Sequence, residues 1–238
     1  MVGGIAGSSG IDDTIPPVSE PPFVAEHFRR QDERDDRLFY GSARLVTHID
    51  DYAIGAIRQL YAELLPAGGE ILDFMSSWKS HLPEDASYGR VAGLGLNETE
   101  LRENDQLDAR VVHDVNAEPR LPYADGEFDA AVMAVSVQYL TRPVEVFREV
   151  RRVLRPGGPF VVTYSNRLFP EKAIALWWSC DMEQRARLVG AYFHYAGGWE
   201  QITTQDRSPR PGVPARPAGG PCDPLFAVWA YRAGDGAS

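Results

Sequence analysis

The chain has 238 residues, 44% of them hydrophobic and 11% aromatic, which is enough for one domain with a substantial core and leaves little room for a second. Its formal net charge of −10 argues against a nucleic-acid-binding protein, because such proteins need a concentrated basic face. We expect the partner to be a small molecule or a protein, and the sequence gives no oligomeric state.

The two ends and the cysteines bear on the compartment. Residues 1–22 are rich in glycine, serine and proline, and predict a disordered arm rather than a signal peptide. No apolar run approaches the length that a bilayer requires, so no membrane partner is expected. Cys180 and Cys222 lie far apart and outside any metal spacing, which favours free thiols in a reducing compartment. We therefore expect a cytoplasmic protein.

One domain is expected over residues 23–232, with a short tail at 233–238. Its first residues, 23–36, are highly charged and predict a surface helix or a flap. Residues 207–221 are rich in proline and predict a flexible insert, with an arginine-bearing flap over a cleft as the alternative.

A regular alternation of elements predicts the fold class. Apolar residues recur at three- and four-residue steps from Leu45 to Leu64 and predict an amphipathic helix, which Pro66 and Gly68 end. Apolar runs after it predict strands at Glu70–Phe74, Arg90–Leu94, Arg110–Val112, Phe128–Val135, Phe160–Tyr164, Trp199–Thr204 and Leu225–Tyr231. Helices are predicted after Asn97 and at Thr141–Leu154, Glu171–Cys180 and Met182–Ala196. Strands separated by helices predict an α/β protein, with a mostly parallel sheet and helices on both faces.

The segment Ile71–His81 is the strongest local signal for a ligand. A short apolar run ends at Asp73 and is followed by a loop of small and polar residues, which is typical of a nucleotide-type cofactor site at the carboxyl end of a first strand. The loop contains no glycine.

Two longer motifs carry a resemblance to a known family. Residues 114–129 read DVNAEPRLPYADGEFD, and residues 148–158 read REVRRVLRPGG. Both resemble motifs of the class I S-adenosylmethionine-dependent methyltransferases, in the family's order. The resemblance implies a Rossmann-like fold with a seven-stranded sheet and an antiparallel last strand. It also implies S-adenosylmethionine as the cofactor, lying across the carboxyl ends of the first strands.

The resemblance assigns cofactor roles position by position. Asp73 matches the acid that supports the methionine end, and Asp114 matches the acid near the adenine amine. Gly95 stands where the family has the second-strand acid that binds the ribose, and Asn97 is expected to replace part of that acid. The expected cofactor contacts are Asp73, Met75, Ser76, Ser77, Gly95, Asn97, Asp114, Val115 and Ser136.

The loop after the first predicted strand departs from the family pattern. The family's glycines fall on Met75, Ser77 and Lys79, whose side chains crowd the approach of a ligand to the backbone. Shorter motifs also resemble a subgroup of this superfamily: the loop after the first strand, residues 48–51 (HIDD), Ser136–Leu140 and Ser165–Phe169.

Three residues are candidates for a general base. His48 falls with Arg44 and Asp51 at four- and three-residue steps, a polar stripe on the predicted helix that faces either a substrate or solvent. His81 ends the loop and can act as a base or simply fix the loop's shape. Tyr139 follows the fourth predicted strand.

Substrate contacts are expected from Arg44 and Asp51 and from the ends of later strands. Gln138 follows the fourth strand, and Asn166 and Arg167 follow the fifth, with Arg167 suited to a carboxylate or phosphate. Trp78 is either a core residue or a platform for an aromatic or cationic ligand. His48, His81 and Asp50 or Asp51 contain the donor types of a metal site without a recognised spacing, and no metal is assigned.

The sequence thus supports three hypotheses. The first is a methyltransferase-like enzyme that binds S-adenosylmethionine in an atypical way and acts on a small molecule. The second keeps the fold for a non-methylating reaction, such as a cyclase, lyase or metal-assisted reaction. The third is a non-catalytic binding or regulatory protein.

Overall fold

The computed structural model describes residues 20–209 and 222–234. Its strands are β1 (Glu70–Phe74), β2 (Arg90–Gly95), β3 (Ala109–Val112), β4 (Ala130–Ala134), β5 (Pro159–Tyr164), β6 (Trp199–Asp206) and β7 (Phe226–Arg232). Its helices are α1 (Asp36–Tyr40), α2 (Asp51–Leu64), α3 (Glu98–Glu103), α4 (Pro143–Val153), α5 (Ala175–Trp178) and α6 (Met182–Ala196), with short 3₁₀ turns at Ala25–Phe28 and Val137–Tyr139. The predicted arm at residues 1–22 and the insert at 207–221 lie largely outside the described residues.

The strands form one seven-stranded sheet in the order β3-β2-β1-β4-β5-β7-β6. All neighbours from β3 to β5 are parallel, and β7, the last strand of the chain, pairs antiparallel with both β5 and β6. The predicted α/β, Rossmann-like class, the mostly parallel sheet and its antiparallel last strand are confirmed. The chain reverses its order of strands between β1 and β4, and in such folds ligands bind at that point.

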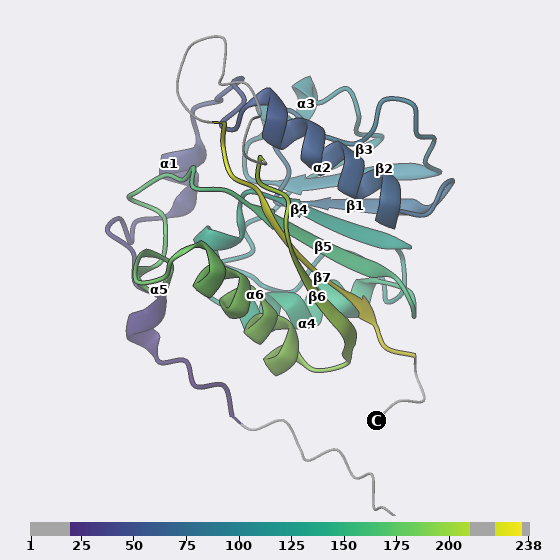
Figure 1. Cartoon of the computed structure of the whole chain (residues 1–238). Helices are drawn as coiled ribbons and strands as arrows, with labels where there is room; N and C mark the ends of the chain where they lie inside the picture. Colours follow the sequence, from purple (N-terminus) through teal and green to yellow (C-terminus); the bar gives the residue numbers. More distant parts are fainter. Residues whose placement is uncertain (1–19, 210–221, 235–238) are drawn as a thin grey trace, which may run out of the picture.

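Two apolar cores lie on the two faces of the sheet (Figure 1). Helix α2 covers one face, with Ala53, Ile57 and Leu60 buried over β1 and β4. Helices α4 and α6 cover the other face, where Phe147 and Phe193 pack on each other and on Phe160 of β5. Because β1, β2, β4 and β5 are covered on both faces, their residues read as continuous apolar runs.

Helix α2 begins later than predicted. Asp50 is its N-cap, and the Asp50 carboxylate accepts a hydrogen bond from the Ala53 amide at 2.9 Å, so the helix starts at Asp51 and not near Leu45. The apolar period continued into a segment that is not helical, and Leu45 is exposed. The predicted stripe of Arg44, His48 and Asp51 on one helix is therefore wrong.

Other boundaries shift by smaller amounts. The strand predicted from Phe128 begins at Ala130, and Phe128 makes only an isolated parallel bridge with Leu154. The helix predicted over Glu171–Cys180 shortens to α5. The predicted helix after Asn97 is confirmed, since the Asn97 side chain caps α3 by accepting from the Glu100 amide at 3.0 Å.

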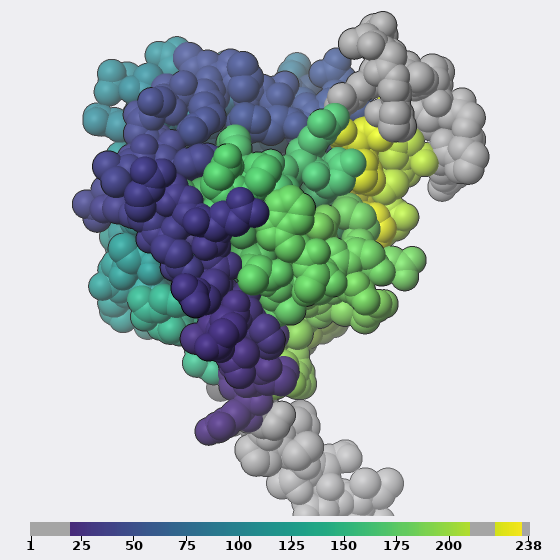
Figure 2. Space-filling model, turned by 90° about the vertical axis from the view of Figure 1, so that its left-hand side faces the viewer, coloured from purple at the N-terminus to yellow at the C-terminus, as the bar shows by residue number. Residues whose placement is uncertain are grey.

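The segment of residues 20–50, which we call the cover segment, lies against the carboxyl side of the sheet. Figure 2 shows it in purple, lying across the green residues that follow β5. Backbone hydrogen bonds join the Asp32 amide to the Glu171 carbonyl and the Ala175 amide to the Arg29 carbonyl. The charged segment predicted as a surface helix or flap is thus fixed on the domain. Among the described helices, none has both the length and the apolarity needed to cross a bilayer.

Candidate functional site

A cavity of about 390 Å³ lies at the carboxyl edge of the sheet, beside the point between β1 and β4 where the strand order reverses. Its size is within the range of small-molecule sites, about 300–1,000 Å³. Most of the predicted site residues line it: Arg44, His48, Asp73, Met75, Ser76, Ser77, Trp78, His81, Gly95, Asn97, Asp114, Val115, Ser136, Tyr139 and Arg167. The sheet and the cover segment together therefore enclose the space to which the sequence pointed.

Asp73 lies at the inner end of this cavity and is almost fully buried. The hydroxyls of Ser76 and Ser80 both donate to its Oδ2, at 2.5 and 2.6 Å. Burial raises the pKa of Asp73 to about 6, although the two serine hydroxyls act in the opposite direction. In the described part of the chain no cation is paired with the Asp73 carboxylate, so this position is suited to a positively charged ligand group.

Backbone strain is concentrated around the cavity. Met75, His81 and Val135 all have positive φ angles, between 49° and 57°, and all three line it. Met75 stands at the family's first glycine position, so the chain keeps the left-handed turn there without the glycine. Strained residues of this kind persist where the surrounding structure holds them, which is characteristic of functional sites.

Gly95, at the end of β2, has a packing role that the sequence did not reveal. The loop after β1 crosses directly over it, since the Ser76 amide donates to the Leu94 carbonyl at 2.7 Å. A Cβ on Gly95 would lie 2.2 Å from the Ser76 carbonyl oxygen. The loop backbone thus fills the space that an acidic side chain at this position would need.

Asn97 has other partners than those expected for a ribose ligand. Its Oδ1 caps α3, and its Nδ2 donates to the Tyr40 carbonyl of the cover segment at 2.7 Å. Glu100, one turn into α3, instead presents its carboxylate to the cavity. Its two oxygens accept from the Arg44 amide at 2.7 Å and the Ser77 hydroxyl at 2.6 Å.

The connections after β3 and β4 supply polar atoms without protein partners. Asp114 accepts two backbone amides on Oδ1, from Asn116 and Ala117, and no hydrogen bond from a described residue reaches Oδ2. Ser136 lines the cavity with a buried Oγ that has no partner. A buried hydroxyl of this kind is costly unless a ligand or water satisfies it.

Aromatic rings form the wall on the side of the cover segment. Tyr139 stacks on Phe169 with ring centroids 5.8 Å apart, and Tyr40 meets both rings edge to face. The Phe169 amide donates to the Tyr139 hydroxyl at 2.8 Å, and burial raises the pKa of Tyr139 to about 12. Tyr139 therefore keeps its proton near neutral pH and is a hydrogen-bond donor there rather than a base.

The two candidate histidines are both uncharged near neutral pH. Burial, with the charges of Arg58 and Lys79, lowers the pKa of His81 to about 4. Burial and Arg44 also lower the pKa of His48, whose ring lies against Phe169 at the mouth of the cavity. Neutral imidazoles can accept a proton, and His81, with the lower basicity, is the weaker acceptor.

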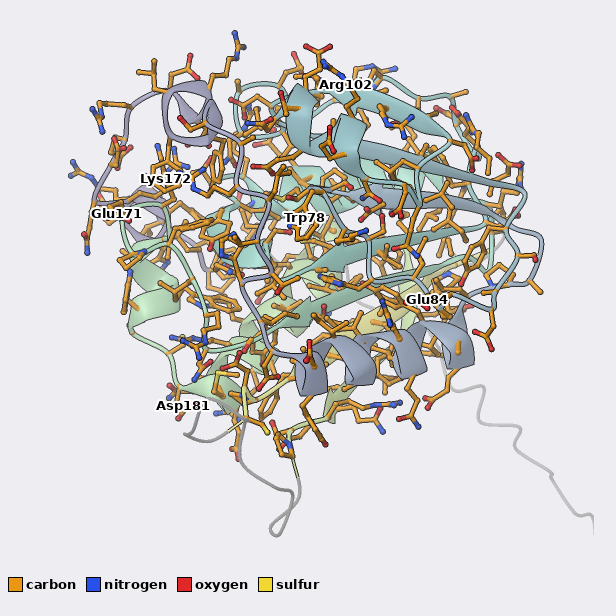
Figure 3. The ribbon with its side chains drawn as sticks, turned by 90° about the horizontal axis from the view of Figure 1, so that it is seen from above. Trp78, Glu84, Arg102, Glu171, Lys172 and Asp181 are labelled. Carbon is orange, nitrogen blue, oxygen red and sulfur yellow. The ribbon has the colours of Figure 1, made fainter. Side chains whose placement is uncertain are left out.

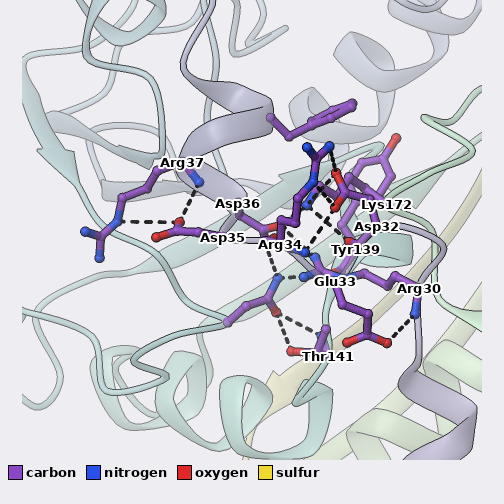
Figure 4. Close-up of polar contacts among 12 residues, drawn as sticks. Arg30, Asp32, Glu33, Arg34, Asp35, Asp36, Arg37, Tyr139, Thr141 and Lys172 are labelled. Carbon is purple, nitrogen blue, oxygen red and sulfur yellow. Dashed lines mark hydrogen bonds and ion pairs between the residues drawn. The ribbon is translucent and has the colours of Figure 1, made fainter.

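A buried ionic cluster holds the cover segment over the cavity (Figure 4). Lys172 is fully buried, and its Nζ lies 2.9 Å from Asp36 Oδ1. Arg30 contacts both oxygens of Asp36 at 2.9 Å, and Asn116 donates to Oδ2. Burial disfavours the charge of Asp36, but these three donors outweigh it and lower its pKa.

Figure 3 shows Trp78, whose Nε1 donates to the Val46 carbonyl, near the centre of the molecule seen from above.

Three predicted substrate contacts do not line the cavity. Asp51 is exposed in the first turn of α2, and Asn166 is exposed after β5. Gln138 is fully buried, and its Nε2 donates to the Val135 carbonyl at 2.9 Å, so it braces the strained residue from behind. Within residues 20–209 and 222–234, no three His, Cys, Asp or Glu side chains converge as metal ligands, and Asp50 serves as a helix cap.

Sequence reasoning missed several residues of the site: Asp36, Tyr40, Glu100, Asn116 and Phe169. Asp36 and Tyr40 lie in a segment without apolar period, so no pattern placed them near the sheet. Glu100 was recognised only as the third residue of a capped helix. One signal in the sequence could have indicated Glu100: it is an acidic residue a few positions after Gly95, where the family's acid is missing.

Comparison with known proteins agrees with this geometry. Residues 77–162 match a family described as "Methyltransferase domain". The ubiquinone/menaquinone biosynthesis C-methyltransferase UbiE of Roseobacter denitrificans is 38% identical over 93 residues, which are 35% of this chain and 36% of that protein. Over this stretch the chain is similar to methyltransferases, and its Rossmann-like fold is that of S-adenosylmethionine-dependent methyltransferases. It spans between 13% and 50% of the length of the curated relatives that it matches.

Solved structures of this fold are similar over most of the chain. A methyltransferase in complex with the Trm112 activator of Haloferax volcanii has a TM-score of 0.59 at 14% identity, over 77% of this chain and 92% of that chain. The [4+2]-cyclase SpnF has a TM-score of 0.54 at 18% identity, over 74% of this chain and 80% of that chain. At these identities the likeness concerns the fold.

Proposed function

We propose that the chain is a class I S-adenosylmethionine-dependent methyltransferase, which binds S-adenosylmethionine in the cavity at the carboxyl edge and transfers its methyl group to a small molecule held under the cover segment. The observation that carries the proposal is the cavity at the strand reversal, with a carboxylate at two positions that match the family pattern, Asp73 near the end of β1 and Asp114 just after β3. The partnerless Oδ2 of Asp114 and the buried Oγ of Ser136 fit a polar ligand there.

The ribose is expected to bind differently from the family pattern. The Ser76 carbonyl occupies the space for an acid at Gly95, while Glu100 brings a carboxylate to the cavity from α3. An ionised carboxylate has about four acceptor positions, and Glu100 uses two. Glu100 is therefore the residue that we assign to the ribose hydroxyls.

The chain's own contribution to methyl transfer is orientation and exclusion of water. The bound cofactor supplies the methyl group from a sulfonium, and in-line displacement needs mainly a positioned acceptor. Tyr40, Tyr139 and Phe169 close the far side of the cavity and keep water from it. Tyr139 can donate a hydrogen bond to the acceptor, and His48 or His81, both neutral, can take its proton.

Calorimetry with S-adenosylmethionine and S-adenosylhomocysteine tests the proposal. Both should bind the wild-type chain, and Asp114→Asn and Glu100→Gln should each weaken binding by about tenfold, because each removes a charge-assisted hydrogen bond. Glu100→Gln should have little effect on an analogue that lacks the ribose hydroxyls. Absence of heat with either nucleotide would contradict cofactor binding, and an equal loss for the hydroxyl-free analogue would contradict the role of Glu100.

A non-methylating reaction in the same cavity is the second candidate. The loop that crosses Gly95 and the acid brought from α3 support it, because the cofactor end of the cavity is rebuilt. The fold is similar to that of the [4+2]-cyclase SpnF. Product formation from a substrate without consumption of S-adenosylmethionine would favour this candidate.

A further inference from the structure

Arg44 occupies an unusual position at the mouth of the cavity. Its guanidinium carbon lies 4.7 Å from the ring centre of Phe39, 5.1 Å from that of Phe169 and 6.0 Å from that of Tyr40. The Arg44 amide is held by Glu100 at 2.7 Å, and Nη2 donates to the Phe39 carbonyl at 2.9 Å. Rings and backbone together fix the guanidinium in one place.

Arg44 differs from the other cations that line the cavity. Lys79 lies 3.0 Å from Asp105, and Arg167 lies 2.8 Å from Asp223. In the described part of the chain, no carboxylate lies within ion-pair distance of the Arg44 guanidinium, which donates hydrogen bonds to two backbone carbonyls. A guanidinium has five N–H donors, so several remain for a ligand. A guanidinium that is held in place and has no carboxylate partner among the described residues is a site for an anion.

The surroundings of Arg44 also define the shape of the ligand. Phe169, which lies under the guanidinium, stacks on Tyr139, and Tyr139 follows β4 beside the partnerless hydroxyl of Ser136. Flat aromatic walls favour a flat, conjugated ligand over a flexible chain. The proposed cofactor contacts Asp73 and Asp114 come from the ends of β1 and β3, whereas the rings around Arg44 come from the cover segment and from the connections after β4 and β5, so we assign the guanidinium to the acceptor side.

We propose that the methyl acceptor is a planar aromatic or conjugated acid, whose carboxylate pairs with the Arg44 guanidinium while its ring lies against Tyr139 and Phe169. This inference rests on the proposed function, because it takes the cavity to be the substrate site. It names a substrate class that the superfamily fold leaves open.

Binding of four probes tests this assignment: p-coumarate, its methyl ester, tyramine and hexanoate, each measured by calorimetry with and without S-adenosylhomocysteine. The acid should bind about tenfold or more tightly than the ester and the amine, and more tightly than the non-aromatic acid. Arg44→Gln should reduce the affinity for p-coumarate to that of the ester, and should leave the affinities for the ester and for S-adenosylhomocysteine unchanged. Arg44→Lys, which keeps the charge without the planar fork, should lose part of the preference.

The matched control is Arg37→Gln, on the same segment but 70% exposed and outside the cavity, which should change none of these affinities. Thermal unfolding verifies that each variant is folded. Equal binding of acid and ester, tightest binding of tyramine, or an unchanged preference in Arg44→Gln would overturn the inference. Loss of S-adenosylhomocysteine binding in Arg44→Gln with p-coumarate binding retained would also overturn it, because Arg44 would then hold the cofactor's carboxylate. If wild-type chain binds p-coumarate as described but no nucleotide, the proposed function fails and the acid site stands.

Discussion

At the scale of single residues, Asp73 is a carboxyl group whose charge is disfavoured by burial. Its pKa in the folded chain is about 6, against 3.8 for an unperturbed aspartate. Between these two values the folded state holds a proton that the unfolded state has released, so the free energy of unfolding falls as pH rises through this window. Above pH 6 the ionised carboxylate costs the folded protein about 3 kcal/mol. A cationic ligand group would offset this cost.

We expect Asp73→Asn to stabilise the ligand-free protein, with a gain that grows from pH 4 to pH 6 and levels off at about 1–3 kcal/mol above it. The same variant should lose cofactor affinity, because the amide carries no charge. Urea unfolding at several pH values measures the first effect, and calorimetry the second. Asp85→Asn, at an exposed carboxylate outside the cavity lining, is the control and should show no such pH dependence. A uniform destabilisation at all pH values would contradict the raised pKa.

Gly95 offers a second test, in which restoring the family's acid should fail. Gly95→Ala and Gly95→Asp both place a Cβ 2.2 Å from the Ser76 carbonyl oxygen, where backbone must move. We expect both to destabilise the protein by about 2 kcal/mol or more and to weaken cofactor binding. Gly55→Ala in α2, whose new Cβ meets nothing within 4 Å, is the control and should be neutral or stabilising. Improved nucleotide binding by Gly95→Asp would show that the loop yields and the family site is recovered.

At the scale of elements, buried charges anchor the cover segment in addition to its aromatic packing, in which Phe23 contacts Tyr192. Lys172 joins Asp36 to backbone carbonyls of Asp32 and Arg34, and Arg30 completes the cluster. Removal of one partner from such a cluster leaves a buried charge with less compensation, which is strongly destabilising. The cluster therefore couples the position of the cover to the integrity of the cavity.

Lys172→Met is expected to lower the free energy of unfolding by about 3 kcal/mol and to expose the cover segment to proteolysis between Arg29 and Arg37. Limited trypsin digestion and urea unfolding measure the two effects. Arg37→Gln breaks only an exposed contact on the same segment and should change neither, apart from the loss of one cleavage site. If Lys172→Met lowers stability without faster cleavage, the cluster stabilises the domain but does not hold the cover.

At the scale of the whole molecule, a ligand in the cavity touches the sheet, α3 and the cover together. S-adenosylhomocysteine at about 100 times its dissociation constant should stabilise the fold by about 2.7 kcal/mol, and raise Tm by about 5–10 °C. Adenosine, which lacks the group expected at Asp73, should give a smaller rise at the same concentration. Equal rises in Tm with both ligands would show that contacts at the methionine end do not contribute to binding.

The sequence by itself determined the class of fold and the region of the site. Strand and helix periods alternate in the order expected of an α/β sheet, and the acids Asp73, near the end of β1, and Asp114, just after β3, mark its carboxyl edge. These signals are local, because each depends on residues close together in the chain. For the same reason the sequence predicted α3 and its Asn97 cap correctly.

Only the tertiary structure decided which polar residues face the cavity. Gly95 leaves no room for a side chain because the Ser76 carbonyl lies over it. The Asn97 amide group donates to the Tyr40 carbonyl instead of facing a ligand, and Gln138 is buried behind Val135. The apolar period also placed the start of α2 too early, at Leu45, because apolar spacing does not reveal that Asp50 caps the helix. Such outcomes depend on contacts between residues far apart in sequence. The charged segment that encloses the cavity has no period at all, so its place over the sheet follows from buried ion pairs that form only when the chain is folded.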